Sequence, residues 1–232
     1  MKKLLTSIAA FGILSSSQVM AQDLSIKVTN LTNGIHFTPL LVSAHDANSR
    51  LFMEGTTAST SLQAMAEGGD ISALSTDIQA LGGDVSENPA AGLLAPGANT
   101  SFTLMTGSTN TYLSLTAMLL PTNDGFVGAD SIMIPATAGT YTYYLNAYDA
   151  GTEANNEVIN GAGTPGDLGI PADPSAENGT GATGITTAEN NTMVHIHRSN
   201  MGDRDATGGT SDLDSTVHRW LNPVAQLIIT VN

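Results

Sequence analysis

Apolar and polar residues alternate in several stretches of the chain, and this pattern predicts β-strands. Residues 24–30 alternate with a period of two, which is typical of a strand with one buried face. The run 37–42 contains Pro39, so we expect an edge strand or a bent strand there. Further strands are predicted at 101–105, 111–120, 141–148, 193–198 and 224–231.

A helical period replaces the alternation between residues 57 and 81. Apolar residues recur there at steps of three and four, with Gly68-Gly69 between two sets, so we predict two short helices. Ser59 or Thr60 is the expected N-cap of the first helix and Asp70 that of the second. Residues 84–100 are predicted to be a loop, and 151–190 a long excursion without apolar periodicity.

This order of elements indicates the fold class. Roughly seven strands joined by polar connections predict an all-β fold, an antiparallel β-sandwich with a small helical insertion. No repeat and no second domain is visible, so residues 22–232 are expected to form one domain.

The first 21 residues have the three-part pattern of a secretory signal peptide. Lys2 and Lys3 are followed by a short apolar run, and Val19-Met20-Ala21 offers a cleavage site. The apolar run is shorter than the roughly 20 residues that span a bilayer. We therefore expect a secreted or periplasmic protein with no transmembrane segment after signal cleavage.

Composition narrows the possible functions of the exported chain. Loss of Lys2 and Lys3 leaves five basic residues against 21 acidic ones, a formal charge of −16. Such a surface repels nucleic acid and attracts divalent cations, so no nucleic-acid partner is expected. The chain has no cysteine, which excludes disulfides, thiol nucleophiles and thiolate metal sites.

Two acidic segments lie at predicted strand ends. One runs from Leu120 to Ser131 and the other from Tyr148 to Ala154. If both lie at one edge of the sandwich, Asp124, Asp149 and Glu153 face one another and repel unless they are protonated or bound to a cation. Calcium suits such a cluster because it takes six to eight oxygen ligands in flexible geometry. The alternative is a pair of acidic turns with exposed carboxylates.

Two other groups of residues are weaker candidates for metal sites. His195 and His197 share one face of a predicted strand, but no third ligand stands at a clear spacing, so we favour structural or surface histidines. Four aspartates in a Gly-rich segment could form a second weak calcium site, although a solvated loop is the simpler interpretation. These aspartates are Asp203, Asp205, Asp212 and Asp214.

Several of these segments resemble one family. The stretch from Asn123 to Ser131 is similar to the D-W-F-V-G-x-D-S motif of the spondin N-terminal domain, found in F-spondin and mindin, and Tyr148 to Glu153 resembles its Y-D-A-G-T-D motif. Thr38 to Leu41, His45, Leu51 to Gly55, Ala66 to Asp70 and Trp220 to Ala225 follow the family's order. The resemblance runs from about Leu24 to Val231 and is that of a bacterial, single-domain secreted member.

The resemblance implies a C2-like antiparallel β-sandwich with a calcium ion held by loop carboxylates. The residues that match the family's acidic positions are Asp124, Asp149 and Glu153, the last where aspartate is usual. Gly125 stands in place of the family's tryptophan, and the cysteines and thrombospondin repeats of the animal members are absent.

The leading hypothesis is a non-catalytic calcium-binding module that mediates adhesion to a surface, matrix or membrane. Its expected partners are calcium and anionic lipid, glycan or matrix protein. Two alternatives stay open: an extracellular hydrolase that uses Asp124 and Asp149 as catalytic carboxylates, and a purely structural matrix protein.

Overall fold

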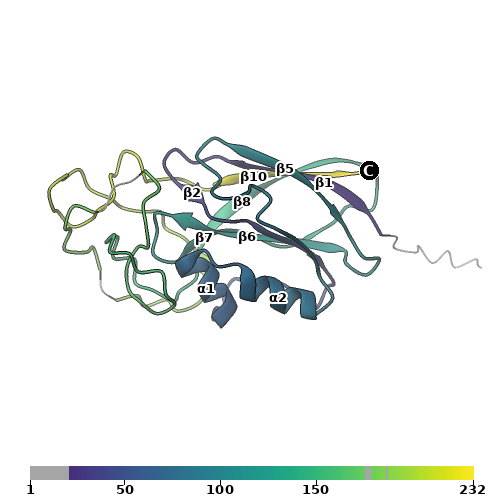
Figure 1. Ribbon diagram of the computed structural model, residues 1–232, viewed down its shortest axis with the longest axis horizontal. Coiled ribbons are helices and arrows are strands. Elements are labelled where there is room, and N and C mark those ends of the chain that lie inside the picture. The colour runs from purple at the N-terminus through teal and green to yellow at the C-terminus, as the bar shows by residue number, and fades with distance from the viewer. Residues whose placement is uncertain (1–20, 176–178, 187) are drawn as a thin grey trace, which may run out of the picture.

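The computed structural model describes residues 21–175, 179–186 and 188–232, and the fold is all-β with two short helices (Figure 1). The predicted signal peptide falls on residues 1–20, outside the described residues, apart from Ala21. The strands are β1 (Asp23–Asn30), β2 (His36–Phe37), β3 (Leu41–His45), β4 (Asp84–Glu87), β5 (Asn99–Met105), β6 (Tyr112–Leu120), β7 (Gly125–Met133), β8 (Gly139–Asp149), β9 (His195–Ile196) and β10 (Ala225–Val231).

The strands form an antiparallel sheet in the order β4-β3-β6-β7-β8-β10-β1-β5. Strand β8 joins two layers, because its first part, Gly139–Leu145, pairs with β10 and its last part, Asn146–Asp149, pairs with β7. In Figure 1 the layer of β5, β1 and β10 lies above β6 and β7. The predicted β-sandwich is therefore the observed architecture.

Alternating side chains from both layers fill the space between them. Leu24, Ile26 and Val28 of β1 point inward and are at most 1% exposed. They belong to one apolar cluster with residues of β3, β6, β7 and β10, so the strict alternation of residues 24–30 does reflect one buried face.

A second apolar cluster lies on the other side of β6, between this strand and the helices α1 (Thr60–Gly68) and α2 (Ser72–Ala80). Strand β6 is covered on both faces, which explains its continuous run of buried residues. The N-cap of α1 is Ser59, whose Oγ accepts the Leu62 N–H at 3.1 Å, as predicted. The N-cap of α2 is Ile71 rather than Asp70, although the Asp70 carboxylate accepts the Ser72 N–H at 2.9 Å.

Two segments that the sequence indicated to be loops contain strands. Strand β7 begins at Gly125, within the first acidic segment, and pairs with β6 and β8. Strand β4 lies inside the predicted loop 84–100 and pairs with β3. In both cases sheet pairing with distant residues overrides a local sequence that is rich in glycine and polar residues.

The described residues between 150 and 222, here called the loop cap, cover one end of the sandwich, at the left of Figure 1. Apart from β9, the described part of this segment is held by turns and isolated bridges, such as the one between Ile159 and Ile170. Among the described residues, no helix is long and apolar enough to cross a membrane.

Candidate metal centre

The end of β8 and the start of β7 bring Asp124 and Asp149 to the same edge of the sheet, under the loop cap. Gly125 pairs with Asp149 across the two strands, and the Ala150 N–H donates to the Asp124 carbonyl at 3.2 Å. The two aspartates are 0% and 1% exposed. The alternative of two acidic turns with exposed carboxylates is therefore wrong.

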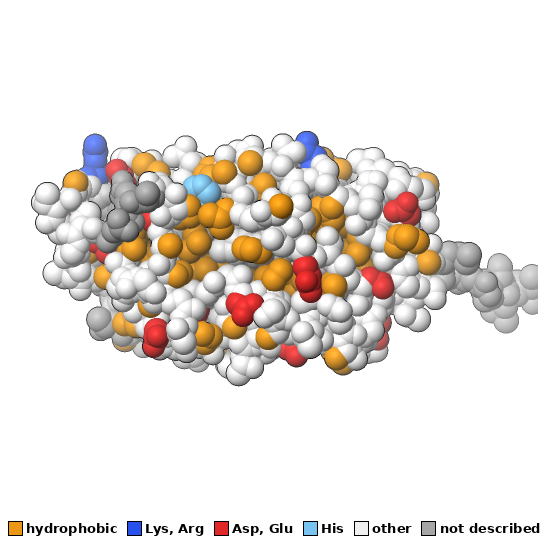
Figure 2. Space-filling model, in the orientation of Figure 1, with side chains coloured by type: hydrophobic (Ala, Val, Ile, Leu, Met, Phe, Trp, Pro, Cys, Tyr) orange, Lys and Arg blue, Asp and Glu red, His pale blue; other side chains and the backbone are white. Residues whose placement is uncertain are grey.

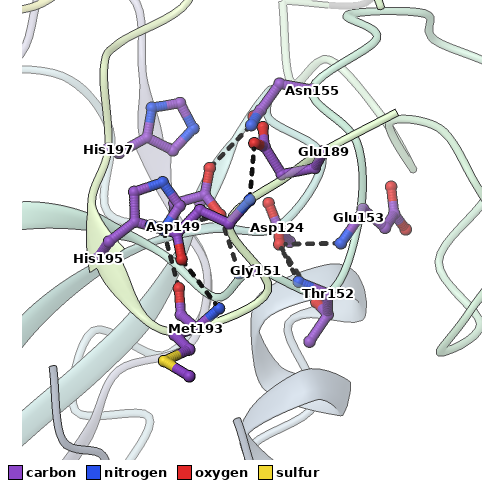
Figure 3. Close-up of polar contacts among 12 residues, drawn as sticks. Asp124, Asp149, Gly151, Thr152, Glu153, Asn155, Glu189, Met193, His195 and His197 are labelled. Carbon is purple, nitrogen blue, oxygen red and sulfur yellow. Dashed lines mark hydrogen bonds and ion pairs between the residues drawn. The ribbon is translucent and has the colours of Figure 1, made fainter. Parts of the chain in front are cut away.

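The Asp124 carboxylate is satisfied on one oxygen only. Its Oδ2 accepts the backbone N–H groups of Thr152 at 2.8 Å and Glu153 at 3.1 Å, and also the Thr152 hydroxyl at 3.2 Å (Figure 3). Its Oδ1 is buried and has no hydrogen-bond partner among the described residues. Burial, followed by the nearby Asp149 carboxylate, raises the pKa of Asp124 to about 8.

The Asp149 carboxylate holds the turn that follows β8. Its Oδ1 accepts the Gly151 N–H at 2.8 Å, and its Oδ2 accepts the Asn155 side-chain amide at 2.7 Å. Gly151 has a φ of 70°, and a Cβ there would lie 2.6 Å from the Thr192 carbonyl carbon, so only glycine fits. The tight turn keeps the Asp149 side chain beside Asp124.

Glu153 contributes its backbone, not its carboxylate, to this pair. Its side chain points away from Asp124 in Figure 3, and its Oε2 accepts from the Asn123 side-chain amide and the Gly169 N–H, both at 3.1 Å. Burial raises the pKa of Glu153 to about 7. Within the described ranges, no group of three or more acidic, histidine or cysteine side chains is arranged to hold a metal. The structure thus brings together two of the three predicted ligands.

The two histidines occupy different surroundings beside the aspartates. His195 Nδ1 lies 3.8 Å from Asp149 Oδ1 and 2.8 Å from the Met193 carbonyl. His197 is 3% exposed and packs against Trp220, with ring centroids 5.1 Å apart. Its Nδ1 accepts the Ser199 N–H at 2.9 Å, so the neutral ring carries its proton on Nε2, and burial lowers its pKa to about 4. His197 Nε2 is buried and has no hydrogen-bond partner among the described residues.

Gly125, which departs from the family motif, stands where a side chain has no room. A Cβ at this position would lie 2.8 Å from the Thr122 hydroxyl and 3.1 Å from Cδ2 of His197. The His197 ring and Thr122 occupy the space that a side chain at 125 needs.

Three residues that sequence reasoning did not single out organise the surroundings of the pair. Asn123 is 1% exposed, donates to Glu153 and to Asn156 Oδ1 at 2.9 Å, and accepts the Glu157 N–H at 3.2 Å. Asn155 donates to Asp149, as described above, and Glu157 is a buried carboxylate. Their only signal in the sequence is proximity to the two acidic motifs.

The four aspartates of the Gly-rich segment do not form a uniform solvated loop. Asp212 is 4% exposed and accepts the N–H groups of Ile159 and Thr180 at 2.7 and 2.6 Å, whereas Asp205 is exposed. Together with Asp203 and Asp214, these residues line a cavity of about 350 Å³. Their carboxylates fix the backbone of neighbouring loops.

Comparison with known proteins gives a family match for the region that holds the aspartate pair. The model of the family described as Spondin_N matches residues 27–158, more than half of the chain. The matched region includes Asp124, Asp149 and Glu153, and ends before β10. No curated protein matches the chain.

Proposed function

Because the chain belongs to the Spondin_N family, we propose that it is a calcium-binding adhesion module that acts outside the cytoplasm. Domains of this family are typical of extracellular proteins and are generally non-enzymatic. The proposal goes further than the family in three respects: the bound ion, the adhesive role and the partners. All three are argued from the chemistry of the aspartate pair.

The buried pair of Asp124 and Asp149 carries the proposal. Two carboxylates that face each other away from water repel when both are ionised, and burial adds a desolvation cost. Neighbouring backbone N–H groups satisfy Asp124 Oδ2 but leave Oδ1 without a partner among the described residues. A bound cation would neutralise both charges and give this oxygen a partner.

The donor atoms at this site suit calcium best. The two buried carboxylates of Asp124 and Asp149 offer oxygen, and calcium prefers such hard ligands, with water completing its shell. The chain offers no thiolate. When bound, calcium would supply positive charge that keeps both aspartates ionised and ties the sheet edge to the loop cap.

Adhesion is the role that fits a strongly acidic module of this kind. The formal charge of the chain without its leader opposes direct binding to anionic lipid, glycan or matrix protein, and calcium reduces that repulsion. The hydrolase alternative requires substrate contact with Asp124 and Asp149, whose exposures of 0% and 1% argue against it.

Thermal unfolding in calcium and in chelator tests the metal proposal. At calcium concentrations tenfold above the dissociation constant, we expect a stabilisation of about 1.4 kcal/mol. Asp149→Asn should abolish this response, whereas Asp205→Asn, which removes an exposed carboxylate of the loop cap, should retain it. An equal response in both variants, or no response in the parent protein, would disprove the proposal.

A further inference from the structure

A short groove lies where the segment 50–57 meets the two helices, and we call it the helix groove. It has a volume of about 290 Å³ and is lined by residues of this segment, of α1 and of α2. Its apolar walls come from Phe52, Leu62 and Leu74, which are 4%, 1% and 4% exposed. Met53 also lines the groove and is 41% exposed, so it forms part of an apolar rim.

Hydrogen bonds fix the walls of the helix groove in place. Ser61 of α1 donates its hydroxyl to the Asp77 carboxylate of α2 at 2.5 Å, which ties the two helices together. The Gly55 N–H donates to the Val194 carbonyl, and the Val194 N–H donates to the Thr56 carbonyl, both at 2.8 Å. These two bonds hold the third wall to the loop cap. A groove that is already formed loses little conformational entropy when a partner binds.

The surroundings of the helix groove carry an excess of negative charge. No lysine, arginine or histidine occurs between Arg50 and His195 in the sequence. Arg50 is the one basic residue among the described residues that line the groove, and its Nη1 lies 3.4 Å from Asp130 Oδ2 in an ion pair. Asp77 in the lining and Glu54 beside Met53 are exposed carboxylates. Figure 2 shows acidic side chains over α1 and α2 and no lysine or arginine in that part of the surface.

The size and the charge of the helix groove indicate which partner it suits. Pockets for drug-sized ligands usually measure about 300–1,000 Å³, so this groove suits one inserted apolar side chain better than a large ligand. Protein interfaces commonly depend on such an anchor, seated in a pocket with a polar rim. The acidic chain attracts a cationic partner and repels anionic lipid, anionic glycan and a second copy of itself.

We infer that the helix groove binds a cationic amphipathic segment of another protein, which inserts one apolar side chain that is flanked by lysines or arginines. The apolar side chain contacts Phe52, Leu62 and Leu74. The flanking cations face the exposed carboxylates of Asp77 and Glu54.

The helix groove is separate from the aspartate pair. Neither Asp124 nor Asp149 belongs to its described lining, and its charge attracts cations without a bound metal. The inference goes beyond the proposed calcium-dependent adhesion and does not depend on it.

Fluorescence anisotropy with a labelled synthetic peptide tests the inference. The probe is a helical peptide of leucine and lysine with one apolar face, titrated with leader-free protein in a chelator throughout. We expect saturable binding that weakens at high salt. A second peptide, with the same lysines but serine in place of each leucine, should bind at least about tenfold more weakly because it lacks the apolar anchor.

Matched variants locate the binding on the surface. Met53→Lys places a cation at the rim and should weaken binding of the leucine peptide about tenfold. Met105→Lys, an equal change of charge at a methionine of β5 that is 74% exposed, should leave it within about twofold. Asp77→Asn should weaken binding about threefold, whereas Asp205→Asn on the loop cap should have less effect. Melting curves verify that each variant is folded.

Several results would overturn the inference. They are absence of saturable binding in the chelator, equal affinity for the leucine and serine peptides, and an equal loss in Met53→Lys and Met105→Lys. Binding that requires calcium and disappears in Asp149→Asn would likewise reject the helix groove, while supporting the proposed metal site. A failed calcium response in the melting experiment, by contrast, leaves peptide binding unaffected.

Discussion

In the sandwich, the strands meet over buried leucine, isoleucine and valine side chains, whereas in the loop cap many of the buried groups are carboxylates and amides. Glu157, for example, accepts the backbone N–H groups of Met201 and Gly202 at 2.6 and 2.8 Å and the Ser211 hydroxyl at 2.6 Å. Asp212 plays the same part for Ile159, Thr180 and Ala182.

The contrast follows from how each region satisfies its backbone. In the sandwich the sheet pairs N–H with C=O, and apolar burial provides the stability. The loop cap has little regular pairing, so ionised side chains accept several N–H groups each, in strong charge-assisted hydrogen bonds. This arrangement places several negative charges close together. Their mutual repulsion matters most at Asp124 and Asp149, where the two regions join.

The largest loss of stability is expected from a substitution in the apolar core of the sandwich. Phe126 is fully buried and packs against Phe52 and Tyr148, with ring centroids 5.0 and 5.6 Å apart. Phe126→Ala should lower the free energy of unfolding by about 3–5 kcal/mol, in one transition that includes the loop cap. Urea denaturation followed by circular dichroism measures it, with the exposed Tyr144→Ala as the control. A change below about 1 kcal/mol would contradict this description of the core.

A smaller loss of stability, confined to the loop cap, is expected from a substitution of one of its buried carboxylates. Glu157→Gln keeps the size of the side chain but turns an amide N–H₂ toward the donors that the carboxylate serves, at a cost of roughly 2 kcal/mol. Hydrogen exchange of the loop cap should accelerate while the amides of β1 and β10 stay protected. Glu54→Gln, at an exposed glutamate, should change neither region. Equal acceleration in both regions would show that the loop cap and the sandwich open as one unit.

Acid should destabilise the loop cap more than the sandwich, without any mutation. Backbone hydrogen bonds from Asp205, Thr210 and Ser211 lower the pKa of Asp203. For Asp212, burial acts to raise the pKa, but hydrogen bonds from Thr180 and Ile159 outweigh it and the net shift is downward. Carboxylates with lowered pKa values stabilise the fold above their ordinary pKa, and this contribution is lost as the pH falls through the folded-state values, below about pH 4.

Pepsin, which cleaves in acid, provides the measurement for this pH effect. Cleavage is expected first within residues 150–222, with the strands of the sandwich intact. Simultaneous cleavage of both regions, or an unchanged loop cap, would contradict the assignment of stability to its carboxylates.

The same contrast explains which features the sequence predicts. The helices and the Ser59 cap depend on neighbours within a few residues, and the alternation in β1 depends on one buried face, so local patterns suffice. Strand β7 escapes the pattern because its first residues are buried on both faces and include Gly125 and Gly128. Its existence depends on pairing with β6 and β8.

For the candidate metal site, the sequence predicts which strand ends meet, but it does not predict the directions in which the side chains point. Asp124 and Asp149 stand next to paired strand ends, so their closeness follows from the antiparallel order. The Glu153 carboxylate turns toward Asn123 and Gly169 because of the loop that follows, and Glu157 meets Met201 across 44 residues. Single-sequence patterns contain no signal for contacts of this kind.

Isothermal titration calorimetry of the chelator-treated, leader-free protein with calcium tests the central claim most directly, namely that a cation at Asp124 and Asp149 joins the sandwich to the loop cap. We predict a single site with a dissociation constant of about 10⁻⁴–10⁻³ M, the range of extracellular calcium modules. Binding should disappear in Asp124→Asn, whose amide still offers an oxygen to the Thr152 and Glu153 N–H groups and so preserves the fold. Absence of binding by the parent protein, or unchanged binding by a folded Asp124→Asn variant, would contradict the claim.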